Sequence, residues 1–240
     1  MKRKVARLGL HSWLLRTPTL NLLIDTCIGA DKERGSGPWS RRQSTRLLDE
    51  LAAQGLQPED IDFVACTHLH GDHVGWNTRL EDGRWVPTFP RARYGISAVE
   101  VEAWARLDAV SDTPVNYGAY RDSILPIVES GQALYVGPGE ILAPGVEIVP
   151  LPGHTLSHFG IEVDHGGDRA LFCGDALHSP VQLVDPRWPS MFCEDRVLGI
   201  ETRVSMLDRV VDERMLLLPA HFRGARAVYL KRQEGGFLPL

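Results

Sequence analysis

Cysteine is scarce in this 240-residue chain, which has four cysteines far apart and no CxxC pair. A chain of this length buries enough surface to fold without disulfides, so reduced thiols of a cytosolic protein are expected. Long apolar runs are also missing. No stretch approaches the ~20 residues that span a bilayer, and charged residues interrupt the apolar start. We therefore expect no membrane span, no signal peptide and a cytoplasmic location.

Clustered basic charge is absent as well. Lysine and arginine number 26 against 31 acidic residues, which gives a net charge of -5, and the basic residues are scattered. Binding to a phosphate backbone depends on a clustered basic face, so a nucleic-acid partner is not expected. The length suits one domain over residues 1–240, and the sequence has neither an internal repeat nor a low-complexity linker.

Apolar runs and helical patterns alternate along the whole chain. Strands are predicted at 19–25, 61–66, 133–136, 146–151, 159–164, 169–174 and 215–219. Helices are predicted at 40–55, 97–107, around 118–130 and near 200–213. Ser40 is a predicted N-cap, and Ser97 with Glu100 has the spacing of a capping box. Mixed strands with helices between them favour a layered α/β domain.

Histidine, in contrast, is concentrated in one short segment of the chain. Three of the nine histidines lie in THLHGDHVGW, residues 67–76, directly after a predicted strand. Four predicted strands in all are followed by side chains that can bind metal, namely His68, His70, Asp72 and His73, then His154, then Asp175, and finally His221. Functional loops gather at strand ends, so these side chains are expected to converge.

This set of donors suits two divalent metal ions. Imidazole and carboxylate without thiolate favour zinc, the commonest hydrolytic choice, and leave iron and manganese open. Two ions roughly 3.5–4 Å apart share a water and lower its pKa, and Asp175 is the candidate bridge. A lone histidine at a strand end is more often structural. The H-x-H-x-D-H spacing differs because it aims two imidazoles the same way while Asp72 and His73 reach the other side.

HLHGDH, with His154, Asp175 and His221, resembles the metallo-β-lactamase fold superfamily over nearly the whole chain. The resemblance implies an αββα sandwich of two mixed sheets flanked by helices, with the metals at one edge of the sheets. It also implies a ligand set: His68, His70 and His154 for the first metal, Asp72, His73 and His221 for the second, and Asp175 between them.

Within the superfamily, the sequence resembles one branch best. The bridging position has no cysteine, unlike the commonest zinc β-lactamases, and His70 stands where diiron flavoproteins have glutamate. Nuclease branches carry large insertions and basic surfaces. THLHGDHVGWNT and the segments 90–94 and 173–183 are similar to N-acyl-homoserine lactonases and methyl parathion hydrolase. Glyoxalase II carries a C-terminal helical extension, whereas here the sequence ends soon after His221.

The resemblance implies a hydrolase that opens lactone or carboxylic ester bonds by attack of a metal-bridging hydroxide. Phosphotriester and thioester hydrolysis are the alternatives, followed by a metal-binding protein without turnover. Asp72 is expected to orient the hydroxide proton. His178 stands where the best-known lactonases have tyrosine, and both a catalytic and a purely supporting role are open. The expected partner is a small ester or lactone substrate. Members of the family are often dimers, so the resemblance leaves a homodimer open.

Aromatic side chains are candidates for an apolar substrate cleft. The candidates are Trp76, Trp39, Phe89 and Trp104, and Trp76 is the best of them because it lies beside the metal motif. Aromatic residues more often belong to the core. His158 is expected to orient a ligand or to pack, and Cys66 and Cys173 are expected to be small core residues.

Overall fold

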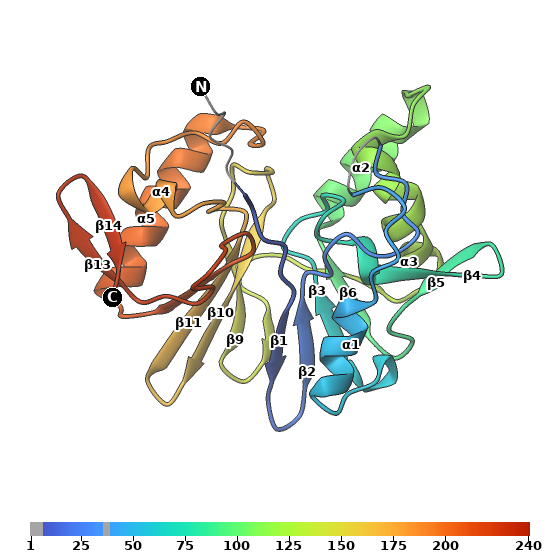
Figure 1. Cartoon of the computed structure of the whole chain (residues 1–240), viewed down its shortest axis with the longest axis horizontal. Helices are drawn as coiled ribbons and strands as arrows, with labels where there is room; N and C mark the ends of the chain where they lie inside the picture. The colour runs from blue at the N-terminus through green and yellow to red at the C-terminus, as the bar shows by residue number, and fades with distance from the viewer. Residues whose placement is uncertain (1–6, 36–38) are drawn as a thin grey trace. The chain divides into compact units, whose positions relative to one another are not determined.

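The computed structural model describes residues 7–35 and 39–240, so the first six residues of the basic start lie outside the described part. The chain divides into two compact units. The N-terminal unit is His11–Val136, and the C-terminal unit is Gly137–Leu240 together with the stretch up to Leu10. Each unit contains one five-stranded mixed sheet with helices (Figure 1), which confirms the predicted fold class. The single domain over 1–240 stays a prediction.

The sheet of the N-terminal unit has the order β1-β2-β3-β6-β7. Its strands are β1 (Trp13–Arg16), β2 (Asn21–Ile24), β3 (Phe63–Ala65), β6 (Arg93–Ile96) and β7 (Ala133–Tyr135). Only β1 runs antiparallel to its neighbour, so β2, β3, β6 and β7 end at the same edge. The helices are α1 (Arg46–Ala53), α2 (Ala98–Val110) and α3 (Leu125–Glu129), and β4 (Thr78–Glu81) and β5 (Arg84–Pro87) form a separate hairpin.

The sheet of the C-terminal unit has the order β12-β11-β10-β9-β8. Its strands are β8 (Ile141–Ala143), β9 (Val146–Pro150), β10 (Phe159–His165), β11 (Asp168–Gly174) and β12 (Leu216–Pro219). β10 and β11 form the predicted antiparallel hairpin, and β12 joins β11 in parallel. The remaining elements are α4 (Val181–Val184), α5 (Arg196–Asp212), β13 (Leu230–Gln233) and β14 (Gly236–Pro239).

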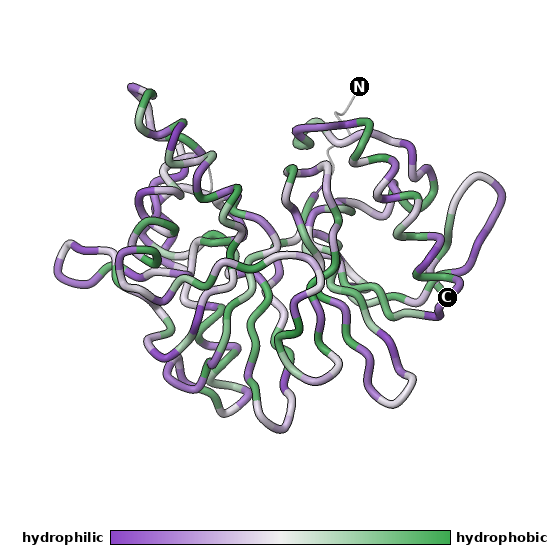
Figure 2. Tube along the Cα trace, turned by 180° about the vertical axis from the view of Figure 1, so that it is seen from behind, coloured by the Kyte–Doolittle hydropathy of each residue, from purple (hydrophilic) through white to green (hydrophobic). Residues whose placement is uncertain are grey.

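Each unit has its own hydrophobic core. Leu23, Val64 and Tyr94 belong to the core of the N-terminal unit, where helices α1, α2 and α3 also contribute side chains. Leu171 and Leu217 belong to the core of the C-terminal unit, together with residues of α5. Hydrophobic residues are concentrated within the strands, whereas most connecting turns are hydrophilic (Figure 2). The sheets therefore give the strand ends a rigid support.

The predicted helix boundaries need two corrections. The helix expected from Ser40 begins at Arg46, because Ser40 Oγ accepts a hydrogen bond from Arg34 N at 3.1 Å outside the helix. The helix expected near 200 begins at Arg196, capped by the carboxylate of Asp195. The cap at Ser97 is confirmed, since its hydroxyl accepts from Glu100 N. Strands β1, β4, β5, β6, β8, β13 and β14 were not predicted.

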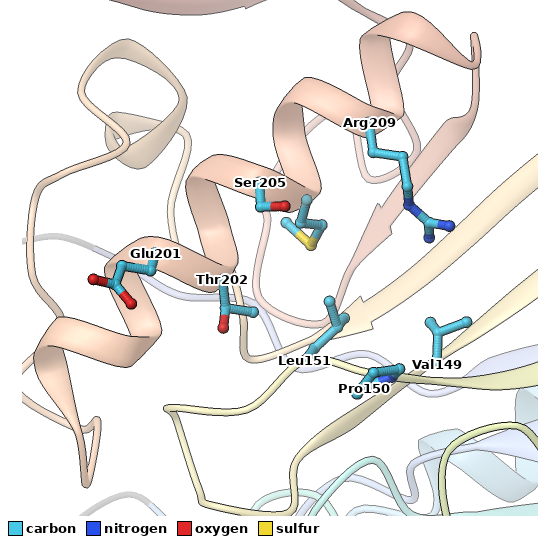
Figure 3. A pocket seen from close by; sticks show the side chains of 8 residues that line it. Val149, Pro150, Leu151, Glu201, Thr202, Ser205 and Arg209 are labelled. Atoms are coloured by element: carbon cyan, nitrogen blue, oxygen red, sulfur yellow. The ribbon is translucent and has the colours of Figure 1, made fainter.

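A cavity of about 480 Å³ lies in the C-terminal unit between α5 and the end of β9 (Figure 3). Leu151 and the α5 side chains of Glu201 and Arg209 are among the residues that line it. None of the predicted site residues lines this cavity, so it is not the candidate site. Among the described residues, no helix is both long and apolar enough to cross a membrane.

Candidate metal centre

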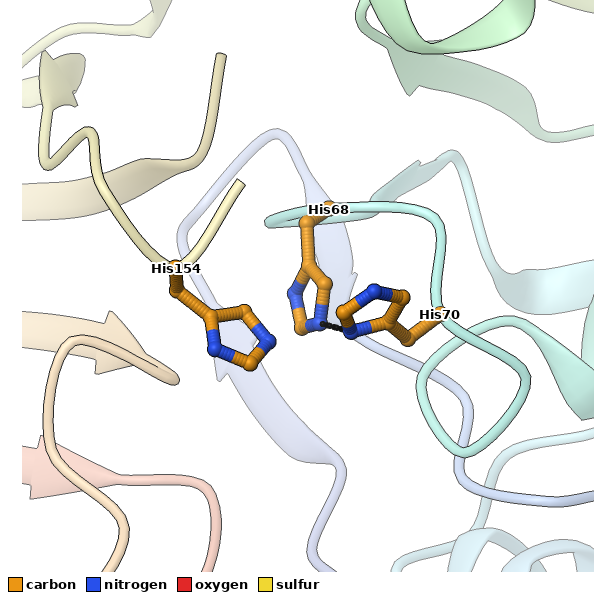
Figure 4. A group of neighbouring side chains, drawn as sticks. All are labelled: His68, His70 and His154. Carbon is orange, nitrogen blue, oxygen red and sulfur yellow. Dashed lines mark hydrogen bonds between the residues drawn. The ribbon is translucent and has the colours of Figure 1, made fainter. Parts of the chain in front are cut away.

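His68 and His70 lie in the loop that follows β3, and their rings face each other. His68 Nε2 is 3.0 Å from His70 Nδ1, and the rings meet edge to face (Figure 4). Zinc–nitrogen bonds of about 2.0–2.1 Å in tetrahedral geometry place two ligand nitrogens roughly 3.3 Å apart. These two nitrogens therefore have nearly the spacing of ligands that share one ion. His154, also drawn in Figure 4, belongs to the C-terminal unit.

His73 is oriented by the buried carboxylate of Asp25. His73 Nδ1 donates to Asp25 Oδ2 at 2.8 Å, and Asp25 also accepts bonds from the amide and the hydroxyl of Thr67. With its proton on Nδ1, His73 presents the lone pair of Nε2, which lies 3.8 Å from Asp72 Oδ2. A carboxylate behind a ligand histidine fixes its ring and raises its basicity. The arrangement therefore prepares His73 and Asp72 for a cation.

Asp25 is a residue of the candidate site that the sequence did not predict. It directly follows β2, as the predicted site residues follow their own strands. Its backbone is left-handed, with φ of 57°, and its side chain is buried. The signal was present in the sequence, because the predicted strand 19–25 ends in this carboxylate.

The segments that follow β2 and β3 run in direct backbone contact. Thr26 N donates to His73 O at 2.6 Å, and Gly75 N donates to Cys27 O at 2.7 Å. A Cβ atom on Gly75 would lie only 1.8 Å from Ile28 O, so this close approach requires glycine. Within the loop of residues 68–73, called the metal loop below, Leu69 N donates to Glu100 Oε2 at 2.7 Å. The loop that carries the histidines is thus fixed through its backbone.

Asp175 lies at the centre of the cluster in the C-terminal unit. It follows β11 directly, while His154 follows β9 and His221 follows β12. The Asp175 carboxylate oxygens lie 3.3 Å from His154 Nε2, 3.3 Å from His178 Nε2 and 2.9 Å from His221 Nε2. All four side chains are buried. A carboxylate grouped with three imidazoles is a donor set of the kind that zinc, iron and manganese take.

Two contacts behind this cluster determine which nitrogens can bind a cation. His221 Nδ1 donates to Gly9 O at 2.7 Å, so Nε2 carries the lone pair. His158 Nδ1 donates to Leu151 O at 2.9 Å, and its Nε2 accepts from Asp175 N at 3.0 Å. Since both nitrogens of His158 contact the backbone, this residue supports Asp175. The sequence predicts that His158 orients a ligand or packs, and its contact with Asp175 N favours the first of the two.

His178 is buried next to Asp175, and its ring is nearly parallel to that of His221, with an interplanar angle of 10°. Within the described part of the chain, neither ring nitrogen of His178 has a hydrogen-bond partner. Its backbone amide donates to Gln182 Oε1 at 2.8 Å. Because Nε2 lies 3.3 Å from Asp175 Oδ2, Nδ1 is the nitrogen whose hydrogen-bonding capacity is unused among the described residues, and such buried polar atoms are rare in folded proteins.

Cys66 and Cys173, which neighbour the predicted donors in sequence, are buried free thiols. Burial raises the pKa of the Cys66 thiol to about 12 and also raises the pKa of Cys173. A thiol binds a metal ion as the thiolate, and burial disfavours that form in both residues. The remaining donors are imidazole and carboxylate, and they fit zinc, iron or manganese.

The structure thus groups the predicted site residues within each unit. His68, His70, Asp72 and His73 share one loop, and His154, Asp175, His178 and His221 form the second cluster. Trp76 is 6% exposed and Phe89 is fully buried in the core of the N-terminal unit. Their role in a substrate pocket stays a prediction. The ring of Trp104 lies 6.1 Å from that of His70.

The chain belongs to the metallo-β-lactamase superfamily, whose family model matches residues 7–221. A hydroxyacylglutathione hydrolase of Synechococcus sp. is 33% identical over 135 residues, which cover 55% of this chain and 41% of that protein. A probable metallo-hydrolase of Mycobacterium tuberculosis is 26% identical over 197 residues, with 74% and 59% covered. The chain therefore spans about two fifths to three fifths of these relatives.

Two solved structures show the same fold. The dizinc quorum-quenching lactonase AidC, in complex with a product, aligns with a TM-score of 0.76 at 20% identity and covers 97% of this chain and 79% of that one. The hydrolase AbOPH aligns with a TM-score of 0.78 at 24% identity, with 97% and 80% covered. At these identities the likeness concerns the fold alone.

Proposed function

We propose that the two clusters hold two divalent metal ions, with zinc favoured, and that the protein hydrolyses lactone or carboxylic ester bonds. In the family pattern, the first ion takes His68, His70 and His154, the second takes Asp72, His73 and His221, and Asp175 bridges. The orientation of the histidines carries this proposal. Asp25 and the Gly9 carbonyl each accept the Nδ1 proton of a histidine, which leaves Nε2 for an ion.

When bound, such ions polarise a carbonyl oxygen and supply a water of lowered pKa. The chain's own residues would position that water and the substrate. The Asp72 side chain is 40% exposed, so its carboxylate can reach the proton of the attacking water and orient it. His178 would donate a hydrogen bond to the carbonyl or to the departing oxygen, since a neutral imidazole has one N–H to give.

An apolar rim beside the second cluster supports a substrate with an apolar substituent. The rim consists of Leu156, Trp188, Met191 and Phe192, which are 64%, 57%, 75% and 57% exposed. The Phe192 ring lies 6.0 Å from the His178 ring. Glu194 N donates to His154 O, and Leu156 N donates to Glu194 Oε2, so the rim is tied to the loop of His154.

Exposed apolar side chains near a buried polar cluster favour a ligand with an apolar part. This rim favours an acyl chain or an aryl group over a glutathione thioester, because the glutathione tripeptide is polar and charged. The phosphotriester alternative shares this preference for an apolar group and stays second. Thioester hydrolysis is third, and a metal-binding protein without turnover is last.

The test compares three substrates with zinc-loaded protein: a long-chain N-acyl-homoserine lactone, an aryl phosphotriester and a thioester. We expect a lactone kcat/KM of about 10⁴ M⁻¹s⁻¹ or above, which is lost in Asp175→Asn. A fast phosphotriester or thioester with a negligible lactone rate would keep the metal site and change the substrate class. No turnover on any ester would support the metal-binding alternative.

A further inference from the structure

The side chain of Asn116 holds the metal loop at the two peptide groups that flank His70. Asn116 Nδ2 donates to Leu69 O at 2.6 Å, and Asn116 Oδ1 accepts from Gly71 N at 3.0 Å. Leu69 O belongs to the peptide group before His70, and Gly71 N belongs to the one after it. One amide therefore fixes the backbone on both sides of a single predicted metal ligand.

The backbone at Asn116 adopts a left-handed conformation, which its two neighbours share. Asn116 has φ of 49° and ψ of 40°, Tyr117 has φ of 52°, and Gly118 has φ of 84°. Left-handed backbone disfavours residues other than glycine, and asparagine tolerates it better than most. Three such residues in a row turn the Asn116 side chain towards the metal loop. Strain of this kind is often found at functional sites.

A buried ion pair supports the turn from behind. Arg34 Nη1 donates to Tyr117 O at 3.1 Å, and the Arg34 guanidinium makes bonds of 2.6 and 2.9 Å to the two carboxylate oxygens of Asp122. A Cβ atom on Gly71 would lie 3.2 Å from Arg34 Nε and 3.3 Å from the Ala119 side chain. The metal loop thus packs closely against the turn, and both are placed by the same arginine.

We propose that Asn116 is a positioning residue for His70, and that its amide sets how tightly the loop 68–73 binds a metal ion. This proposal rests on the metal centre of the proposed function. Asp25 fixes the ring of His73 and the Thr67 hydroxyl contacts the ring of His68, whereas Asn116 acts on the backbone of His70. The loop then has a support for each of its three histidines.

Two substitutions of Asn116 separate its side-chain contacts from its backbone conformation. Asn116→Gly removes both hydrogen bonds and keeps the left-handed conformation accessible. Asn116→Asp keeps an acceptor for Gly71 N and loses the donor to Leu69 O. Tyr117→Gly is the matched control, because Tyr117 has the same backbone conformation and a side chain that is 68% exposed.

The measurements are zinc affinity by chelator competition, the visible spectrum of the cobalt-substituted protein and the thermal midpoint of the metal-free protein. We expect Asn116→Gly to lower the affinity for one zinc ion about 10–100-fold and to change the cobalt spectrum. The loss of affinity should be smaller in Asn116→Asp. Tyr117→Gly should bind zinc as the unmodified protein does. If Asn116→Gly fails to fold, weaker binding in Asn116→Asp supports the proposal, and unchanged binding overturns it.

Unchanged zinc affinity in Asn116→Gly would overturn the proposal, and so would an equal loss in Tyr117→Gly. The result is independent of the substrate. If the unmodified protein binds two zinc ions and hydrolyses no ester, the function is wrong, while a loss of affinity in Asn116→Gly still supports the role of Asn116.

Discussion

In the N-terminal unit, four donors lie within one loop, residues 68–73, whereas in the C-terminal unit the donors come from the ends of β9, β11 and β12. The first cluster depends on other segments that hold its backbone, such as Asp25 and Glu100. The second cluster is placed by its sheet, and its side chains meet around Asp175. The first cluster, formed by one loop, therefore needs hydrogen bonds from other segments, whereas the second cluster, formed by several strand ends, depends on the carboxylate of Asp175.

The largest expected effect comes from Asp175→Asn, which removes the centre of the second cluster. The substitution removes the negative charge next to His154, His178 and His221. We expect the metal-to-protein ratio to fall and kcat/KM to drop by ~10³-fold or more. Metal analysis and ester hydrolysis measure both. Asp168→Asn, at an exposed position of the same unit, should match the unmodified protein. Full metal content and activity in Asp175→Asn would contradict its central position.

A smaller effect is expected when Asp25, which supports the first cluster, is substituted. Asp25→Asn weakens the acceptor that holds His73 and Thr67, so the affinity for one metal ion should fall about 10–100-fold. Chelator competition measures this loss. Asp62→Asn is the matched control, because the exposed Asp62 accepts a bond from Asn21 N at the opposite end of the same strands. If the two variants bind metal equally well, the loop does not depend on Asp25.

The support behind Asp175 should have a milder effect on activity and a clear effect on stability. His158→Leu removes the partner of Asp175 N and of Leu151 O in a buried region. Each lost contact should cost about 1–3 kcal/mol of unfolding free energy, and activity should fall roughly tenfold. Urea unfolding measures the first quantity. His165→Leu, at the exposed end of β10, should change neither quantity. Equal losses in both variants would show that His158 has no special role.

The two units also differ in their buried cations. In the C-terminal unit, Arg203 is 1% exposed and donates to the carbonyl oxygens of Ala176 and Pro186. Burial lowers its pKa, yet arginine stays protonated at any physiological pH. In the N-terminal unit, Lys32 is fully buried, with Nζ 2.9 Å from Asp122 O and 3.5 Å from the Trp85 ring centroid. Burial lowers the pKa of Lys32 to about 7.

The smallest effect on the candidate metal centre is expected from Lys32, which should instead cause a pH dependence of stability. Between pH 7 and 10 the unfolded chain keeps a proton on this lysine that the folded state has lost, so stability should rise with pH. The slope is at most about 1.4 kcal/mol per pH unit. Urea unfolding at pH 7 and pH 9.5 measures it. Lys32→Met should flatten this rise, whereas Lys231→Met, at an exposed position, should keep it. An unchanged slope in Lys32→Met would show that other groups cause it.

Much of the architecture could be predicted from the sequence, because apolar strands end directly at polar donors. The strand before Thr67 and the strand before Asp175 were both located, and the side chains that follow them fall in the two clusters. The hairpin β4–β5 was not predicted, although Asp82 and Gly83 form a typical hairpin turn with φ of 49° and 77°. Its strands are too short and too exposed to give a clear apolar pattern.

The supports of the site could not be predicted in the same way. Asp25 contacts His73 across 48 positions of sequence, and Asn116 contacts Leu69 across 47. No spacing rule connects residues so far apart. Asn116 also depends on a left-handed backbone that its neighbours Tyr117 and Gly118 share, and a tyrosine does not indicate such a conformation.

The backbone contact between the segments after β2 and β3 has a consequence for exchange with solvent. The amides of Thr26 and Gly75 are bonded to His73 O and Cys27 O, so these bonds do not involve a metal ion. Slow deuterium exchange at both amides in the metal-free protein would mean that the loop is already formed before any ion arrives. Little conformational entropy would then be lost when the metal binds, because the binding site would be preorganised.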